Sequence, residues 1–445
     1  MTVALETTPV TIQRMRSAER RLLTLALVVV VGAYTLLGLA QSARIPTGTL
    51  VYGAALGALA LVAHLAVRRF APLADPVMLP AVFLLNGLGV VLVRRIDFAE
   101  GTSLATDQTT WTVVGIGVFA ATLLIVSDHR ILTRYRYTMG LAAIVLLLLP
   151  LAPGIGKEVN GARLWVDLGI VSFQPGELAK LAMVVFLAGY LEEKRALLTV
   201  ATTRLGPLLL PPARHLAPVL MAALAALGIL VFQTDLGSSL LFFGVFVVML
   251  YVATGRLAYP AIGLLACSVG AVAAYVMFGH VRVRFDTWLD PWSVSDLGGF
   301  QIIQALYAMG TGGLTGSGLG LGHPDDIPAA ATDGIFAVLG EELGLLGTAA
   351  VLLCFLIVVA KGYKTALAAG DEHGTLLAVG LTTIVALQVF VIVGGITRLV
   401  PLTGISLPFM SYGGSSLVAN YALVALLLRI GDSARRDALG GADTR

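Results

Sequence analysis

Charged residues and cysteines are scarce in this chain. Asp, Glu, Lys and Arg make up 12% of its 445 residues, about half the share that is usual in soluble domains, and the mean hydropathy is +0.91. These values exclude an ordinary soluble protein. A net charge of +3 and an aromatic content of 7% also exclude the basic, aromatic surface that nucleic-acid binding requires. The two cysteines lie in apolar runs, where they indicate neither a disulfide nor a metal site.

Long apolar runs are what the chain has instead. Twelve runs approach the roughly 20 residues that a membrane-spanning helix needs: 21–41, 49–67, 76–93, 109–126, 137–152, 176–193, 216–232, 236–254, 258–278, 334–360, 374–397 and 410–430. Arginines precede the first run, but the run is longer than the apolar region of a signal peptide, so we expect a retained helix. The sequence therefore predicts an all-α, polytopic integral membrane bundle of about 12 transmembrane helices.

The distribution of Lys and Arg predicts the orientation of these helices, because positively charged segments tend to stay in the cytoplasm. With both termini inside, the cytoplasmic segments carry 20 Lys and Arg residues and the outside loops carry 8. We therefore predict cytoplasmic tails at 1–20 and 431–445. The longest connection, 279–333, is then extracytoplasmic, and a loop of 55 residues between packed spans is typically functional. A second outside loop, 153–175, is also polar.

The long loop carries three carboxylates that are candidates for chemistry. A carboxylate near the membrane face can act as a general base or bind a divalent cation, and partial desolvation raises its pKa towards the working range. Asp290 precedes a proline and is more readily explained as a turn former. Asp296 precedes two glycines and fits a turn, a helix cap or a base. Asp333 follows at the mouth of the next span.

The rest of the loop is predicted to have structural roles. Apolar residues at helical spacing in 300–309 predict a short interfacial or re-entrant helix, with Gln301 on its polar side. Alternate glycines at 316–322 resemble a phosphate cradle, but no strand precedes them and the loop faces away from cytoplasmic nucleotides. We expect these glycines to let the loop bend closely over the helix bundle or over a ligand. His323 stands alone, which does not indicate a zinc site.

Several charges lie inside the predicted spans, where each costs about 2.5–3.5 kcal/mol on insertion scales. They are Glu177, Lys180, Asp235, Glu341 and Glu342. Glu177 and Lys180 are three residues apart on one helix face, so they either neutralise each other or serve a functional site. Two arginines in outer segments, Arg163 and Arg398, are suited to bind a phosphate, although anchoring at the membrane interface is the commoner use of such residues.

Four blocks of the sequence resemble the SEDS family (shape, elongation, division and sporulation), which includes RodA and FtsW. They are NGARLWVDLGIVSFQPGELAKLA at 160–182, QTDLGSSL at 233–240, the loop from WLDPW at 288 through TDGIFAVLGEELG at 332–344, and PLTGISLPFMSYGGSS at 401–416. The match is closer to the RodA branch. Family members are polytopic glycosyltransferases that polymerise the lipid-linked disaccharide lipid II into peptidoglycan glycan strands. The resemblance implies this activity here, in cell-wall elongation and cell shape. A lipid II flippase and a non-catalytic scaffold of the wall-synthesis complex are the alternatives.

The resemblance also implies a domain arrangement and the position of a catalytic base. The family shows about ten spans with the long loop after the seventh, whereas here the loop follows the ninth. Residues 21–75 are therefore expected to form two extra N-terminal helices, and 76–430 the family core. The family's loop pattern places its catalytic Asp where this chain has Val294. By resemblance we expect the base to be Asp296, with Asp290 as the alternative.

In the implied mechanism the Asp accepts the proton of the acceptor sugar's 4-hydroxyl as that oxygen attacks the anomeric carbon of the donor, and undecaprenyl pyrophosphate leaves. Cationic groups and a divalent metal ion, Mg²⁺ or Mn²⁺, would stabilise the leaving group, and no nucleotide is required. The implied partners are lipid II and a class B penicillin-binding protein, in the bacterial plasma membrane. The residues expected to bind substrate are Arg163, Glu177, Lys180, Asp235, Gln301, Asp333, Glu341, Arg398 and Ser411.

Overall fold

The computed structural model describes the chain except for residues 1–8, 46, 160, 168, 170–171, 200–202, 206–207, 211–212 and 441–445. The side chains of 9–11, 159, 199, 203–205, 208–210, 213–216, 219, 296–297 and 440 also lie outside the described part. Two compact units make up the chain. Unit 1 comprises Met1–Ser127, Val283–Lys361 and Gln388–Arg445, and unit 2 comprises Asp128–Arg282 and Gly362–Leu387.

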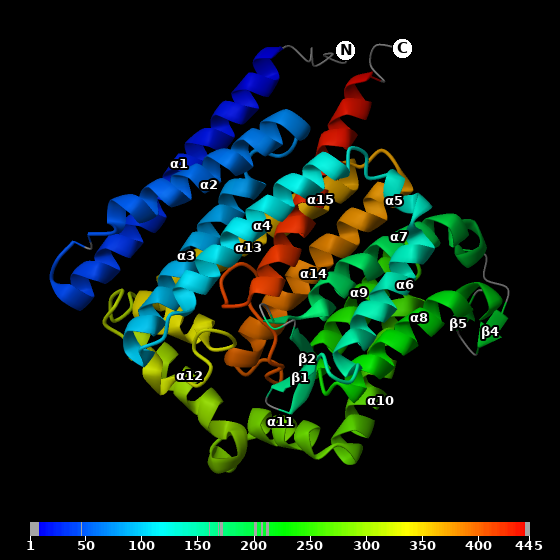
Figure 1. The fold of residues 1–445 in the computed structure, drawn as a ribbon. Helices are drawn as coiled ribbons and strands as arrows, with labels where there is room; N and C mark the ends of the chain where they lie inside the picture. Colours follow the sequence, from blue (N-terminus) through cyan, green and yellow to red (C-terminus); the bar gives the residue numbers. More distant parts are fainter. Residues whose placement is uncertain are drawn as a thin grey trace. The chain divides into compact units, whose positions relative to one another are not determined.

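Unit 1 is built from long apolar helices around a buried pair. Its elements are α1 (Pro9–Ser42), α2 (Thr49–Phe70), α3 (Met78–Glu100), α4 (Leu104–Ile125), most of α11 (Gly279–Leu289), α12 (Phe300–Gly312), most of α13 (Ile335–Ala368), the end of α14 (Glu372–Ile396) and α15 (Gly414–Gly440). The helices α3 and α15 are the most buried of the candidate spans. Figure 1 shows α1 and α2 running beside each other, and α1 also packs against α3.

Small residues let the backbones of neighbouring segments in unit 1 pack closely. A Cβ at Gly89 in α3 would lie 2.6 Å from the backbone of Met410, so the connection between α14 and α15 packs directly on the helix. Asn86, one turn away, donates to the Phe409 carbonyl at 3.2 Å and accepts from the Tyr421 hydroxyl at 3.1 Å. These contacts satisfy buried polar groups, as an apolar environment requires. They also fix the 401–413 connection against the core of the unit.

Unit 2 combines helices with two small antiparallel sheets. Its helices are α5 (Ile131–Arg134), α6 (Arg136–Leu148), the short 3₁₀ helix Leu149–Leu151, α7 (Pro175–Thr199), α8 (Ala213–Phe232), α9 (Leu236–Thr254), α10 (Ala258–Met277) and the start of α14. The first sheet has the order β1-β2-β3, from Gly156–Val159, Ala162–Asp167 and Ser172–Phe173. The second pairs β4 (Thr203–Leu205) with β5 (Leu208–Leu210). Helix α7 packs against α6, α8 and α9.

All twelve predicted spans coincide with helices. In the described part of the chain, nine of these helices are long and apolar enough to cross a membrane: α1, α2, α3, α4, α9, α10, α13, α14 and α15. The remaining three are α6, which is short, α7, which carries charged residues, and α8, whose apolar described stretch is Leu220–Phe232. The prediction of an all-α, polytopic membrane protein is therefore confirmed.

The two segments that were predicted to lie outside contain more regular structure than expected. The 153–175 loop folds into the three-stranded sheet, in which a left-handed Gly161 (φ 77°) reverses the chain between β1 and β2. The 279–333 loop contains α11, a π-helical turn at Ser295–Gly299, α12 and a 3₁₀ turn at Pro324–Asp326. The short helix predicted at 300–309 is confirmed as α12. Polar composition masked the strands and α11 in the sequence, because it is shared by loops and by short exposed elements.

Candidate active site

A carboxylate and a cation meet at the entrance to α13 in unit 1. Helix α11 carries Arg284, whose Nη1 donates to the Thr403 carbonyl at 2.9 Å. The next residue, Gly404, has φ 77°, and a Cβ there would lie 3.6 Å from Asp333 Oδ2 and 3.9 Å from Arg284 Nη2. Burial raises the pKa of Asp333 to about 6, and the nearby Arg284 opposes this rise. The cluster thus offers a carboxylate that titrates near neutral pH beside a permanent cation.

Ser411 fixes the backbone next to this cluster. Its Oγ donates to the Thr332 carbonyl at 2.6 Å and accepts from the Leu407 N–H at 2.9 Å. The neighbouring Tyr412 N–H donates to the Ala331 carbonyl at 2.7 Å. The connection between α14 and α15 is therefore joined to the backbone immediately before Asp333. Ser411, which was predicted to bind substrate, holds the Asp333 segment in place in this structure.

The pKa of Asp333 predicts a pH dependence of stability. Because its pKa is raised from 3.8 to about 6 in the folded chain, the folded state binds a proton that the unfolded state has lost between these values. The free energy of unfolding should therefore fall as pH rises from 4 to 6, by up to about 3 kcal/mol. Thermal unfolding of Asp333→Asn in detergent should lack this fall.

Asp325→Asn provides the control for that measurement, because it neutralises an exposed carboxyl of the same loop. This variant should keep the pH dependence of the native chain. A slope in Asp333→Asn as steep as that of the native chain would remove Asp333 as its source.

Arg398 lies at the C-terminal end of α11. Its Nε and Nη2 donate to the Trp288 carbonyl at 3.2 and 3.1 Å, and Nη2 also donates to the Leu289 carbonyl at 2.8 Å. The Trp288 indole returns a hydrogen bond to the Arg398 carbonyl at 3.0 Å. The guanidinium carbon lies 5.2 Å from the ring centroid of the exposed Trp292. A cation at the last carbonyls of a helix is favourable, so Arg398 anchors α11 in this structure.

The two candidate bases, Asp290 and Asp296, lie in different local structures. Asp290 is exposed, its Oδ1 accepts from the Trp292 N–H at 3.2 Å, and its carbonyl accepts from Ser293 Oγ at 2.9 Å. This is the turn-forming role that the following proline predicted. Asp296 lies in the π-helical turn Ser295–Gly299, between α11 and α12. Its side chain is outside the described residues, so its assignment as the base stays a prediction.

The glycine-rich segment wraps over α13, as expected. The N–H groups of Ser317 and Gly318 donate to the carbonyls of Glu341 and Glu342 at 2.9 and 3.0 Å. A Cβ at Gly316, where φ is 86°, would lie only 2.2 Å from the Glu342 carbonyl oxygen. Only glycine permits this approach. The segment therefore packs on the helix. The N–H groups of Ser317 and Gly318 are used in this packing and do not form a phosphate cradle.

The acidic pair of α13 holds that segment. Glu342 accepts from Arg95 Nε at 2.7 Å and from the Gly320 N–H at 3.0 Å. Glu341 Oε1 accepts from the His323 N–H at 3.1 Å, while its buried Oε2 has no partner in the described part of the chain. Gln301 Nε2 donates to the Pro328 carbonyl at 3.4 Å.

Unit 2 holds a second cluster of charges. Lys180 Nζ lies 2.8 Å from Glu177 Oε2 on α7, and both side chains are less than a tenth exposed. Asp235 caps α9 by accepting from the Ser238 N–H at 2.9 Å, and both charges of the α7 pair act on it electrostatically. Gln233 fixes the turn before it by donating to the Leu147 carbonyl at 2.6 Å. The structure thus brings three of the predicted residues together.

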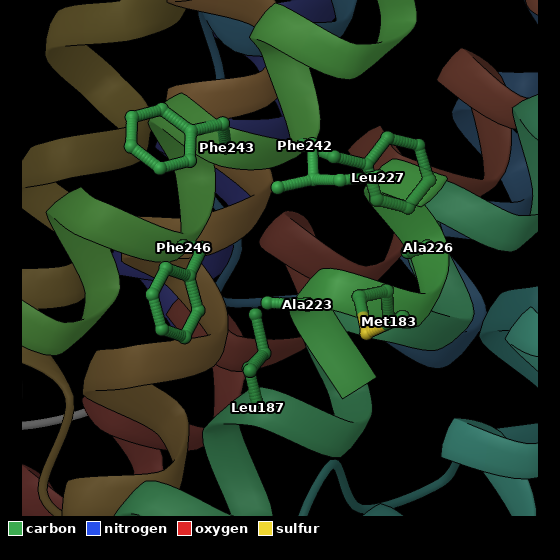
Figure 2. A pocket seen from close by; sticks show the side chains of 8 residues that line it. All are labelled: Met183, Leu187, Ala223, Ala226, Leu227, Phe242, Phe243 and Phe246. Atoms are coloured by element: carbon green, nitrogen blue, oxygen red, sulfur yellow. The ribbon is translucent and has the colours of Figure 1, made fainter. Parts of the chain in front are cut away.

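Apolar side chains border this cluster. A small cavity of about 10 Å³ has Lys180 in its wall with Met183, Val184 and Ile384. A neighbouring cavity of the same size lies among α7, α8 and α9, and Figure 2 shows its three phenylalanine rings, from Phe242, Phe243 and Phe246. Each has room for about one water molecule. Lys180 therefore sits at the edge of an apolar region rather than in an aqueous one.

The remaining predicted residue, Arg163, lies on β2 and is exposed. Its Nε lies 3.0 Å from Glu158 Oε2 across the strand pair, the geometry of a surface ion pair. Sequence reasoning passed over two residues that the structure makes prominent. Arg284 was counted only as a loop charge, and Arg95 only as an outer-loop arginine, although a charge next to an apolar run is the usual signal of a buried partner.

Comparisons with known proteins agree with this architecture. The chain is 46% identical over 428 residues to a protein named peptidoglycan glycosyltransferase RodA from Mycobacterium tuberculosis, covering 95% of this chain and 91% of the relative. It is 38% identical over 319 residues to stage V sporulation protein E of Bacillus subtilis, covering 71% and 84%. A chain solved in a study of the structural coordination of polymerization and crosslinking by a peptidoglycan synthase complex matches with a TM-score of 0.66, at 28% identity, covering 82% and 99%.

The fold and the apolar helices define a multi-pass, α-helical membrane protein. Residues 75–436 match the family model for FtsW, RodA and SpoVE, described as cell cycle proteins. The chain belongs to this family, which confirms the SEDS resemblance. The helices α1 and α2 precede the matched region.

Proposed function

We propose that this chain is a peptidoglycan glycosyltransferase that polymerises lipid II into glycan strands, for cell-wall elongation and cell shape. The observation that carries the proposal is the 46% identity over 95% of the chain to a protein named peptidoglycan glycosyltransferase RodA. The four sequence blocks that suggested the activity contribute the clusters at Asp333 and at Lys180.

The proposed reaction is an attack of the acceptor sugar's 4-hydroxyl on the anomeric carbon of the donor. The proton of that hydroxyl passes to the Asp296 carboxylate, the bond from the anomeric carbon to the pyrophosphate oxygen breaks, and undecaprenyl pyrophosphate leaves. The turn that carries Asp296 joins α11 to α12, and Arg398 anchors the end of α11. We assign Arg398 the role of positioning this turn.

Negative charge grows on the departing pyrophosphate, so cations near it lower the barrier. We propose that Lys180 is one such cation, because its burial at an apolar wall suits a lipid-linked leaving group. Arg163 and Arg284 are further candidates on exposed and half-buried surfaces. Asp333, Gln301, Glu341, Asp235 and Glu177 are proposed to orient the sugars and the cations.

A divalent metal ion, Mg²⁺ or Mn²⁺, is a further proposal, and the described residues do not form a site for it by themselves. Within the described ranges no group of three or more His, Cys, Asp or Glu side chains is placed to hold a metal. The cation of Arg284 also lies close to Asp333. The steps above are therefore assigned to side chains alone. Chelation by EDTA should lower the polymerisation rate, and added Mg²⁺ or Mn²⁺ should restore it; an unchanged rate would discard the metal.

The proposed partner is a class B penicillin-binding protein, which would crosslink the strand that this chain makes. The support is the fold match to a chain from a study of polymerization and crosslinking in one synthase complex. The proposed location is the bacterial plasma membrane with both termini in the cytoplasm, as the Lys and Arg bias predicts.

The decisive experiment is polymerisation of purified lipid II by the full chain in detergent, alone and with the partner protein, with products resolved on a gel. Glycan polymer should form. A flippase or a scaffold would give none, because a flippase moves lipid II across a membrane and detergent provides no membrane to cross. Absence of polymer with and without the partner would overturn the proposal.

The proposed topology is tested by cysteine labelling. In a variant with Cys267 and Cys354 replaced, the exposed Ser317 is changed to cysteine. A membrane-impermeant thiol reagent should label Ser317→Cys in intact spheroplasts. Labelling that requires permeabilisation would place the 279–333 loop in the cytoplasm and overturn the topology.

A further inference from the structure

A polar cavity of about 630 Å³ opens between α1 and α2 in unit 1. Its lining includes four basic side chains and two neutral polar ones: Arg16, Arg20, His64, Arg68, Gln13 and Ser17. Neither helix belongs to the region that matches the family model, which begins at residue 75. The cavity therefore lies outside the clusters assigned to polymerisation.

The two helices pack closely through small and aromatic residues on the side of the cavity away from the N-terminus of α1. Tyr34 and Tyr52 stack with ring centroids 4.3 Å apart. A Cβ at Gly53 would lie 3.3 Å from Val31 Cγ2, and one at Gly57 would lie 3.5 Å from Leu27 Cδ2. Small residues thus bring the helices together along this stretch. Nearer the N-terminus of α1 the space between them holds the basic cavity.

Two of the basic side chains form a fixed wall. Arg16 is 4% exposed, and its guanidinium donates to the Glu19 carboxylate and to the Ala74 carbonyl. His64 is 7% exposed, and its Nδ1 lies 2.7 Å from Glu19 Oε1. Glu19 is fully buried, so its single charge is already shared between Arg16 and His64. This wall is preorganised, because its side chains lose little freedom when a ligand binds.

The other two basic side chains supply unneutralised charge. Arg20 and Arg68 are exposed, and neither has an acidic partner among the residues that the structure describes. Guanidinium groups suit phosphate geometry because they donate two parallel hydrogen bonds. With Glu19 offset by Arg16, these two arginines leave the cavity with a net positive charge.

The surroundings of the cavity favour a lipid. Leu61 and Leu65 precede Arg68 by seven and three residues on α2, which places them on the same helix face. They are 56% and 49% exposed. The apolar run of α1 begins at Leu22, two residues after Arg20. A cationic pocket at the end of a span, continuous with an exposed apolar face, matches a headgroup joined to acyl chains.

We propose that this cavity binds the phosphoryl headgroup of an anionic phospholipid. Arg16 and His64 form the fixed wall, Arg20 and Arg68 close over the phosphate, and the acyl chains lie along the apolar face of α2 at Leu61 and Leu65. The site is separate from the proposed polymerase site and its test does not involve polymerisation.

Native mass spectrometry of the full chain in detergent measures the binding of dioleoyl phosphatidylglycerol, with dioleoyl phosphatidylcholine, whose zwitterionic headgroup has no net charge, as the weaker-binding comparison. The double variant Arg20→Gln/Arg68→Gln should bind phosphatidylglycerol about tenfold or more weakly. Both arginines are exposed, so the fold should survive. The matched control is Arg21→Gln/Arg69→Gln, which removes the same charge from exposed neighbours outside the cavity, and it should keep phosphatidylglycerol affinity within about twofold of the native chain.

Equal losses in the two double variants would show general charge attraction and overturn the site, as would no loss in either. Inorganic phosphate and glycerol 3-phosphate form the soluble arm. We expect neither to displace phosphatidylglycerol at millimolar concentration. Displacement that depends on Arg20 and Arg68 would keep the phosphoryl site and assign it to a soluble ligand, which would overturn the lipid.

Discussion

Replacing Asp296 with asparagine should lower the rate of lipid II polymerisation by about 100-fold or more. Asparagine keeps the size and shape of the side chain but cannot accept the proton of the attacking hydroxyl. Two glycines follow in the same π-helical turn, so the backbone can bring the carboxylate towards the membrane face. The measurement is the initial rate of polymer formation by purified protein in detergent, with expression and lipid II binding unchanged.

Asp290→Asn is the matched comparison, because it makes the same change six residues earlier. Asp290 already accepts from the Trp292 N–H in a turn, and asparagine can make the same hydrogen bond through its side-chain oxygen. This variant should therefore lose much less activity. A near-native Asp296→Asn together with an inactive Asp290→Asn would move the base to Asp290. If both variants polymerise at native rates, the general-base mechanism is wrong.

Breaking the pair on α7 should have the second large effect. Glu177 and Lys180 are buried and 2.8 Å apart, so either Glu177→Gln or Lys180→Met leaves one charge uncompensated. Each single change should destabilise the chain by about 3–5 kcal/mol. The double variant Glu177→Gln/Lys180→Met removes both charges and should recover most of the melting temperature. Because Lys180 is proposed to contact pyrophosphate, the double variant should still polymerise about 100-fold more slowly.

The exposed pair of Lys157 and Asp167 supplies the control on the same unit, with a distance of 3.4 Å. Lys157→Met should change the melting temperature little, because exposed ion pairs are screened by solvent. Melting curves and polymerisation rates of all these variants separate folding from function. A double variant that is stable and fully active would leave the α7 pair with a neutralising role only.

Sequence reasoning located the helices well because a membrane span has a length requirement that hydropathy reports directly. All twelve runs are helical, and α12 was identified from its spacing alone. The strands at 156–173 were missed. Val166 is the only buried residue described in β2, so the sequence lacks the alternation of apolar and polar residues that indicates a strand. A connection between α14 and α15 was predicted, but its shape was not, because that shape depends on close packing at Gly89.

The candidate site was predicted residue by residue, but not as a geometry. The charges at Glu177, Lys180 and Asp235 were identified because each is expensive in a span, and they lie together. Ser411 and Arg398 were expected to contact substrate, whereas both make hydrogen bonds to backbone carbonyls. A sequence motif identifies the important residues but not their contacts. The structure is needed to separate residues that hold the backbone from residues that are free to bind a ligand.

The ion pair between Arg95 and Glu342 constrains the order in which the protein is assembled during synthesis. The two residues are 247 positions apart, so at about 5–20 residues per second the ribosome makes Glu342 about 12–50 seconds after Arg95. Throughout that interval α3 carries an arginine whose partner does not yet exist, and an unpaired charge is held at the lipid headgroups rather than in the bilayer interior. We therefore expect helix α3 to reach its final depth only after α13 has been inserted, and chains that terminate before α13 to be substrates for membrane quality-control proteases.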